Sequence, residues 1–229
     1  MHDAEFDRHA DEYHRLHAQN IRLSGEEPEY FARYKAQDAS WISGGKLPTL
    51  AVLDFGVGIG NSIPFLHASF PDCRIVGLDV SNRSLEVAKA RCGDQAQFLH
   101  FDGERIPAND GDFGLVFAAC VFHHIEPHRH VAALAELHRV LAPGGWLILH
   151  EHNPRNPLTV RAVRDCPFDE RAQLIDASIM SDRALAAGFV QTTIRYRVFF
   201  PSALKLLRPL ERWLTWLPLG AQYCLSSRK

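Results

Sequence analysis

Apolar and polar segments alternate along the chain in a way that predicts strands separated by helices. Short apolar runs are typical of strands buried in a parallel sheet, and apolar residues that recur every three or four positions predict helices between them. Strands that alternate with helices indicate an α/β fold with a mostly parallel sheet. The predicted strands are 50–55, 74–78, 97–101, 113–119, 146–150, 192–200 and 222–226.

The segments between these strands carry helix signals. Residues 5–39 are polar with scattered aromatic side chains, and we expect helices there. Ser81 is a favourable cap for the helix after the second strand, and Gly93 is a favourable end for it. Pro127 occupies the preferred first position of a helix. Further helices are expected at 61–69 and 181–187, whereas residues 153–178 are interrupted by proline and have a mixed pattern.

Residues 201–219 form a separate amphipathic segment. Leucines at 204, 207, 210, 214 and 217 lie on one helical face, with Lys205, Arg208 and Arg212 alongside. In isolation this pattern is typical of a helix on a membrane surface. Pro209 divides the segment, however, and the segment lies between the last two predicted strands. We therefore expect a helical insertion that packs on the core, forms a substrate lid or makes the contact of a homodimer.

Composition limits the class of protein. The chain has 229 residues, of which 46% are hydrophobic and 23% charged, as in ordinary globular domains. Apolar runs fall short of the ~18–20 residues that cross a bilayer, and the charged N-terminus does not resemble a signal peptide. We therefore expect no transmembrane segment and a cytoplasmic location. A net charge of −2 argues against general nucleic-acid binding, and five cysteines without a CxxC pair favour reduced thiols.

Acidic residues and glycines follow the predicted strands. The first strand ends in Asp54-Phe-Gly-Val-Gly-Ile-Gly60, where glycines let a ligand approach the main chain. The second strand ends at Asp79, and the third ends at Asp102-Gly103. Ligands bind at the carboxyl ends of strands in open α/β sheets, so we expect these acids in one site. A carboxylate at the end of the second strand can accept the hydroxyls of a ribose.

Two details distinguish this turn from a dinucleotide-binding turn. The GxGxxG fingerprint would require a third glycine at position 61, which is Asn61. A carboxylate at Asp54 would repel a pyrophosphate and attract a cationic amino group. The turn therefore predicts a nucleoside ligand with a positively charged end, and a nicotinamide-dependent oxidoreductase is the less favoured alternative.

Five segments stand in a fixed order along the chain. They are Val-Leu-Asp-Phe-Gly-Val-Gly-Ile-Gly (52–60), Gly-Leu-Asp-Val-Ser (77–81), Phe-Asp-Gly (101–103), Asp-Phe-Gly-Leu-Val-Phe (112–117) and Val-Leu-Ala-Pro-Gly-Gly-Trp-Leu (140–147). This series resembles the ordered motifs of the class I S-adenosylmethionine-dependent methyltransferases, over roughly residues 48–200. One departure is Gly114, where the family often has aspartate.

The resemblance implies an architecture and a cofactor. The fold would be a Rossmann-like three-layer sandwich, with a seven-stranded, mostly parallel sheet and an antiparallel last strand. A helical N-terminal cap would occupy residues 1–46, and the methyltransferase domain would occupy 47–229, with the 201–219 insertion before the last strand. The cofactor would be S-adenosyl-L-methionine.

The resemblance also implies roles for individual residues. Asp54, with Gly56 and Gly58, would hold the methionine part of the cofactor. Asp79 would bind the ribose hydroxyls, and Val80 would pack on the adenine.

On the adenine side, Asp102 would accept a hydrogen bond from the adenine amino group, beside Phe101 and Gly103. Cys120 lies where family members offer a backbone carbonyl to the cofactor amine. Tyr13, in the N-terminal cap, is a candidate to close over the cofactor.

Histidines gather after the fourth and fifth predicted strands. His123 and His124 follow the fourth, and His152 ends the fifth beside Glu151. Histidine titrates near neutral pH, so these three are candidate general bases, with ordinary packing as the alternative. His150 and His152 share one face of a strand, but they lack a clear third ligand, so we expect no metal.

These observations predict an enzyme that moves a methyl group to an oxygen or nitrogen atom of a small molecule. The Asn/Asp-Pro-Pro-Tyr/Phe signature of DNA and protein amide methylases is replaced by Ala-Cys-Val-Phe at 119–122. Residues 151–159 resemble bacterial methyltransferases associated with glycans or secondary metabolites, so a sugar or a secondary metabolite is a candidate acceptor. The alternative is a non-catalytic sensor or partner subunit that binds S-adenosylmethionine.

Overall fold

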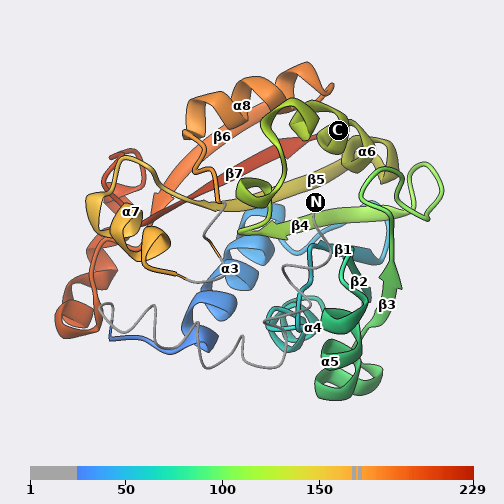
Figure 1. Cartoon of the computed structure of the whole chain (residues 1–229), viewed down its shortest axis with the longest axis horizontal. Coiled ribbons are helices and arrows are strands. Elements are labelled where there is room, and N and C mark those ends of the chain that lie inside the picture. Colours follow the sequence, from blue (N-terminus) through green and yellow to red (C-terminus); the bar gives the residue numbers. More distant parts are fainter. Residues whose placement is uncertain (1–24, 167–168, 170–171) are drawn as a thin grey trace.

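The computed structural model describes residues 25–166, 169 and 172–229, in which one sheet lies between two layers of helices (Figure 1). The strands are β1 (Ala51–Phe55), β2 (Arg74–Asp79), β3 (Gln97–His100), β4 (Phe113–Ala119), β5 (Leu141–His152), β6 (Val190–Arg197) and β7 (Gln222–Arg228). The α-helices are α3 (Pro28–Ser43), α4 (Ile63–Ser69), α5 (Asn82–Cys92), α6 (His130–Val140), α7 (Pro157–Arg164), α8 (Ala177–Ala186) and α9 (Glu211–Leu214). The 3-10 segments are η2 (Gly93–Gln95), η3 (Phe122–His124), η4 (Pro127–Arg129) and η5 (Ser202–Leu210).

The sheet has the order β3-β2-β1-β4-β5-β7-β6. Strands β1 to β5 are parallel, and β7 runs antiparallel to both of its neighbours. This confirms the mostly parallel sheet with a reversed last strand. The strand order changes direction between β1 and β4, and ligands bind at such a switch point in open α/β sheets. The carboxyl ends of β1 and β4 therefore mark the expected site.

The two faces of the sheet are covered by different helices (Figure 1). Successive strand residues point to opposite faces, so Val52 packs with α3 and α4 and Leu53 packs with α6 and α8. In α3, which falls in the predicted N-terminal cap, Ala36 and Ala39 are fully buried in the same apolar cluster as Val52. The described part of the predicted cap therefore shares the core of the predicted methyltransferase domain.

Local signals place several helix ends where the sequence predicts them. The hydroxyl of Ser81 accepts a hydrogen bond from the Ser84 backbone at 3.0 Å and caps α5, and Gly93 follows the end of that helix. Helix α7 lies in the proline-interrupted segment 153–178, whose mixed pattern did not predict a particular element. Its cap is Asn156, whose side chain accepts from two backbone N–H groups, and Pro157 occupies its first turn.

Strand β5 begins at Leu141, five residues before the predicted start at Trp146. Leu141 pairs with Phe113, and the register shifts beside Gly114. A Cβ atom at Gly114 would lie 2.3 Å from the Thr49 carbonyl oxygen. Close passage of the backbone near Thr49 therefore explains why this position departs from the family's aspartate.

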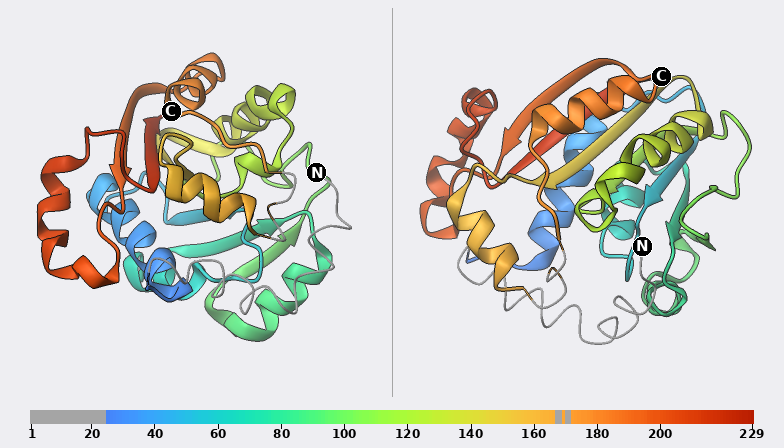
Figure 2. Two further views of the ribbon diagram at one scale, coloured as in Figure 1. Left: turned by 60° about the vertical axis from the view of Figure 1, so that its left-hand side comes forward. Right: turned by 45° about the horizontal axis from the view of Figure 1, so that its top comes forward.

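The insertion at 201–219 contains η5 and α9 and stands at one extremity of the molecule (Figure 2). No residue of Ser202–Leu214 is buried. Seven of the fifteen large apolar side chains exposed in the described chain lie here, at 204, 206, 207, 210, 213, 216 and 219. This exposure argues against packing on the core, and a lid or a contact between two copies stays a prediction. Within the described ranges, no helix is long and apolar enough to cross a bilayer.

Candidate active site

The turn after β1 forms a cradle beside a buried carboxylate. The side chain of Asp54 is 1% exposed, and its Oδ2 atom has no hydrogen-bond partner in the part of the chain that the structure describes. Burial and the neighbouring charge of Asp79 raise the pKa of Asp54 to about 8. At Gly58, with φ +54°, a Cβ atom would meet no atom within 4 Å, so the space over the turn is open. A cationic group can enter there and pair with Asp54.

The carboxylate of Asp79 joins the end of β2 to this turn. Its Oδ2 accepts from the Gly58 backbone at 2.8 Å, and its Oδ1 accepts from the Ser81 backbone at 2.9 Å. A carboxylate oxygen has two acceptor sites, so each oxygen can also accept a hydroxyl. The geometry is therefore compatible with a ribose at Asp79.

A cavity of about 280 Å³ opens beside the end of β3. Phe101 and Gly103 line it, together with Phe55, Ile106, Ile125, Arg129 and neighbouring residues of α6. Val80 is buried, and a Cβ atom at Gly103 would be 3.6 Å from it. Asp102 is exposed, and its Oδ1 accepts from the backbones of Glu104 and Arg105, which lowers its pKa. The Asp102 carboxylate therefore also stabilises the loop that follows it.

Cys120, at the end of β4, is part of a charged cluster that the sequence analysis missed. Lys35 of α3 is 6% exposed, and its Nζ lies 3.2 Å from the Cys120 Sγ. Burial raises the pKa of Cys120, but Lys35 and a hydrogen bond with His152 outweigh burial and lower the pKa to about 6. The family resemblance implies a role only for the backbone carbonyl of Cys120, whereas a pKa of about 6 also favours the thiolate form of its side chain at pH 7.

We expect Cys120 to be the first of the five cysteines to react with iodoacetamide at pH 7. With a pKa of about 6 it is roughly nine-tenths thiolate there, whereas an ordinary thiol is mostly protonated. The rate of its alkylation, followed by peptide mass spectrometry, should have its midpoint near pH 6. Lys35→Met should move that midpoint upward by about one pH unit, and the exposed Lys89→Met should not move it. Faster labelling of Cys73, whose pKa burial raises, would contradict this assignment.

His123 is held by a buried glutamate. Its Nδ1 lies 2.6 Å from Oε2 of Glu151, and both side chains are 1% exposed. The other oxygen of Glu151 accepts from the backbones of Val121 at 2.9 Å and Phe122 at 2.7 Å. Burial lowers the pKa of His123, but Glu151 and Asp169 outweigh burial and raise it well above its usual range. Burial likewise raises the pKa of Glu151, and the charge of His123 lowers it to about 2.

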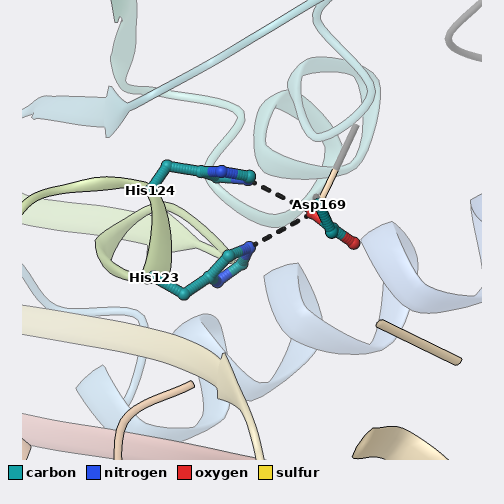
Figure 3. A group of neighbouring side chains, drawn as sticks. All are labelled: His123, His124 and Asp169. Carbon is teal, nitrogen blue, oxygen red and sulfur yellow. Dashed lines mark ion pairs between the residues drawn. The ribbon is translucent and has the colours of Figure 1, made fainter. Parts of the chain in front are cut away.

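The structure brings the three predicted histidines together and adds Asp169. The His123 and His124 side chains leave the same turn of η3, and both point toward Asp169 (Figure 3). Their Nε2 atoms lie 3.6 and 3.4 Å from Oδ1 of Asp169. The ring of His152 is centred 5.2 Å from that of His123. Burial and the charge of His123 lower the pKa of His124.

His150 does not belong to this group. Its ring packs against those of Tyr34 and Phe117, each centred 5.9 Å away. Burial, with the charges of Lys35 and Arg197, lowers its pKa well below its usual range. His150 is therefore a neutral core residue. Tyr13, the remaining predicted site residue, lies outside the described residues.

Comparisons with known proteins identify a methyltransferase domain in this chain. Residues 52–145 match the family model described as a methyltransferase domain. The chain is 34% identical over 106 residues to a demethylmenaquinone methyltransferase of Thermus thermophilus, which covers 45% of this chain and 47% of that protein. It is 30% identical over 164 residues to a trans-aconitate 2-methyltransferase of Azoarcus, which covers 72% of this chain and 59% of that protein.

A similar fold occurs in the crystal structure of an S-adenosylmethionine-dependent methyltransferase from Thermotoga maritima, described as a possible histamine N-methyltransferase. It covers 99% of both chains, with a TM-score of 0.69 and 21% identity. At this identity the match shows the shared fold alone. The chain spans about half the length of the curated relatives it matches.

Proposed function

We propose that this chain, whose residues 52–145 match a methyltransferase domain, is a class I S-adenosylmethionine-dependent methyltransferase that transfers a methyl group from that cofactor to an oxygen or nitrogen atom of a small molecule. The observation that carries this proposal is the buried Asp54 carboxylate, with an unpartnered oxygen beside an open glycine turn. The ionised form of this buried carboxyl requires a cationic partner, and the cofactor has an amino group at that end of the molecule. The cofactor supplies a methyl group that is already activated on a sulfonium.

We assign the cofactor site to residues at the ends of four strands. Asp54, Gly56 and Gly58 would bind the methionine part, and Asp79 the ribose. Val80, Phe101, Asp102 and Gly103 would form the adenine side, and the backbone of Cys120 would accept from the cofactor amine. The cavity beside Phe101 and Gly103 supports this assignment, because it lies where the adenine would be.

The acceptor would bind on the side of β4 and β5 that carries the histidines. His152 is partly exposed and hydrogen-bonds to Cys120, so we assign it the role of general base. In the protein without a bound metal ion, Glu151 and Asp169 raise the pKa of His123 well above its usual range, which makes His123 a hydrogen-bond donor rather than a base. With His124, it would position the acceptor. The protein's contribution is therefore alignment of the acceptor and removal of its proton.

A methyl-transfer assay tests the proposal. The acceptor panel starts with demethylated quinones and small carboxylic acids, after the names of two relatives, and adds sugars and amines. For an identified acceptor whose nucleophilic atom carries a proton at the assay pH, His152→Asn should lower kcat about 100-fold or more and leave cofactor affinity unchanged. The exposed His128→Ala is the matched control. Unchanged turnover in His152→Asn would show that His152 is not a general base and that the protein acts only by aligning the acceptor. Cofactor binding without turnover of any acceptor would favour the non-catalytic sensor.

Cofactor binding should release a proton from Asp54. With a pKa of about 8, this carboxyl is mostly protonated at pH 7 in the free protein. A cationic partner favours the ionised form, so binding lowers the pKa and expels up to about 0.9 proton at pH 7. Affinity should therefore rise with pH between 6 and 8. Calorimetry in two buffers of different ionisation enthalpy measures the release, and the heat of Asp54→Asn should be the same in both. Equal heats for the wild-type protein would refute the linkage.

A further inference from the structure

The two histidines of η3 and Asp169 bring three potential metal-binding atoms close together. One donor atom from each, the two Nε2 atoms and one carboxylate oxygen, lies within 4.8 Å of the others. Figure 3 shows both rings directed at the carboxylate from the same side. Three side chains that converge on one point in this way define a binding site for a single small ion.

The spacing of these atoms suits coordination better than hydrogen bonding. The distances of 3.4 and 3.6 Å exceed the ~2.7–3.2 Å of an ordinary N–H···O hydrogen bond. In a tetrahedral zinc site, bonds of ~2.0–2.2 Å separate neighbouring ligand atoms by about 3.4 Å. An ion between the three donors therefore requires little movement of the side chains.

Glu151 provides the support that metal-binding histidines need. It engages Nδ1 of His123 at 2.6 Å, which leaves Nε2 directed at the site. Metal-bound histidines usually donate their other N–H group to a carboxylate or carbonyl, which sets the ring orientation. Backbone hydrogen bonds hold the Asp169 side of the site. The Gln173 N–H donates to the His123 carbonyl at 2.8 Å, and the Asp169 N–H donates to the Cys166 carbonyl at 3.1 Å.

The charges of the site also suit a divalent cation. Glu151 and Asp169 are both buried and contribute two negative charges. A divalent ion with two neutral imidazoles balances both, and buried charges are stable only when they are paired or bound to a metal. We propose that His123, His124 and Asp169 bind one divalent transition-metal ion, of which Zn²⁺ is the best match.

The donor set limits the identity of the ion. Two imidazole nitrogens and one carboxylate oxygen favour zinc or another first-row transition metal over Mg²⁺ and Ca²⁺, which prefer oxygen ligands. Three protein ligands leave a position for water or for an oxygen or nitrogen of a bound molecule, as in catalytic zinc sites. No metal was expected from the sequence, because His150 and His152 lack a third ligand. The proposed site instead combines His123 and His124 with Asp169, which lies beyond α7.

Zinc binding can be measured without any enzyme assay. The full-length protein is stripped with a chelator, and Zn²⁺ is titrated against a chromophoric competitor. We expect one equivalent to bind tightly, and Asp169→Asn and His124→Ala each to weaken it at least 100-fold. Zinc should raise the Tm of the wild-type protein and leave that of Asp169→Asn unchanged. Each variant is shown to be folded if its Tm without zinc is close to that of the wild-type protein without zinc.

Two controls separate this site from the five thiols. His128→Ala, which removes an exposed histidine, and Cys120→Ser should both bind zinc as the wild type does. Co²⁺ should give the visible absorption of a nitrogen and oxygen site without the near-ultraviolet band of cobalt–thiolate bonds. Binding that survives Asp169→Asn and His124→Ala, a cobalt–thiolate band, or no binding above the level of a buffer control would each overturn the proposal. Because these measurements need neither cofactor nor acceptor, failure of the proposed methyl transfer would not affect them.

Discussion

Replacing Asp79 by alanine is expected to weaken S-adenosylmethionine binding at least 100-fold in calorimetry. The carboxylate has two functions, because it accepts from Gly58 and Ser81 and, in the proposed complex, from the ribose. Hydrogen bonds to a charged group contribute ~1.5–3 kcal/mol each, and about 2.7 kcal/mol corresponds to a factor of 100. Loss of the ribose contact together with distortion of the glycine turn therefore accounts for the effect.

Asp79→Asn separates the two functions. Its side chain retains one acceptor oxygen, so affinity should fall less than in the alanine variant. The exposed Asp72→Ala, in the loop just before β2, removes an acid without contact to the turn and should leave affinity unchanged. Thermal unfolding of each variant shows that the chain is folded. If folded Asp79→Ala bound the cofactor with wild-type affinity, the assignment of the ribose to Asp79 would be wrong.

The sheet and the cofactor side of the site are predictable because local sequence carries their signals. Apolar runs mark the strands, and an acid lies within two residues of the carboxyl end of β1, β2 and β3, so Asp54, Asp79 and Asp102 can be found without a structure. Parallel strands bring their carboxyl ends to one edge, which turns separate sequence positions into one site. The cap Asn156 and Pro157 also signal α7, although the prolines around them obscured its period.

The charged residues Lys35 and Asp169 could not be assigned to the site from the sequence, because only tertiary packing brings them there. Lys35 lies on α3, far from β4 in the sequence. The one local indication that Lys35 is buried is its place beside Ala36 and close to Ala39, on the buried side of the helix. Asp169 follows α7 in a segment without periodic pattern, and its role depends on the position of η3. Gly114 is similar, because its need for glycine comes from the Thr49 carbonyl, which no strand pattern indicates.

Glu151→Gln is expected to lower the free energy of unfolding by about 3 kcal/mol near pH 6 in chelator-treated protein. Glutamine retains an oxygen that accepts from Val121 and Phe122, so the main loss is the charge beside His123. Breaking a buried ion pair costs ~3–5 kcal/mol because the remaining charge is left uncompensated, and here Asp169 still compensates part of it. Chemical denaturation at several pH values measures the difference.

The pH dependence follows from the two pKa shifts. The pKa of Glu151 is lowered from 4.5 to about 2, so its contribution is present above pH 4.5 and is lost as the pH falls toward 2. The pKa of His123 is raised above 6.5, so its contribution is complete below pH 6.5 and is lost as the pH rises through the folded-state value. The difference between wild type and Glu151→Gln should therefore be largest between about pH 4.5 and 6.5.

The chain contains a matched control for this experiment. Glu126 and His128 form an exposed glutamate–histidine pair at 3.5 Å. Exposed ion pairs contribute ~0–1 kcal/mol, so Glu126→Gln should leave both the stability and its pH dependence within error of the wild type. Nuclear magnetic resonance titration of His123 provides a second readout, because its pKa should fall in Glu151→Gln and stay unchanged in Glu126→Gln. A His123 pKa that does not respond to Glu151→Gln would show that Asp169, rather than Glu151, holds the imidazolium in the folded protein.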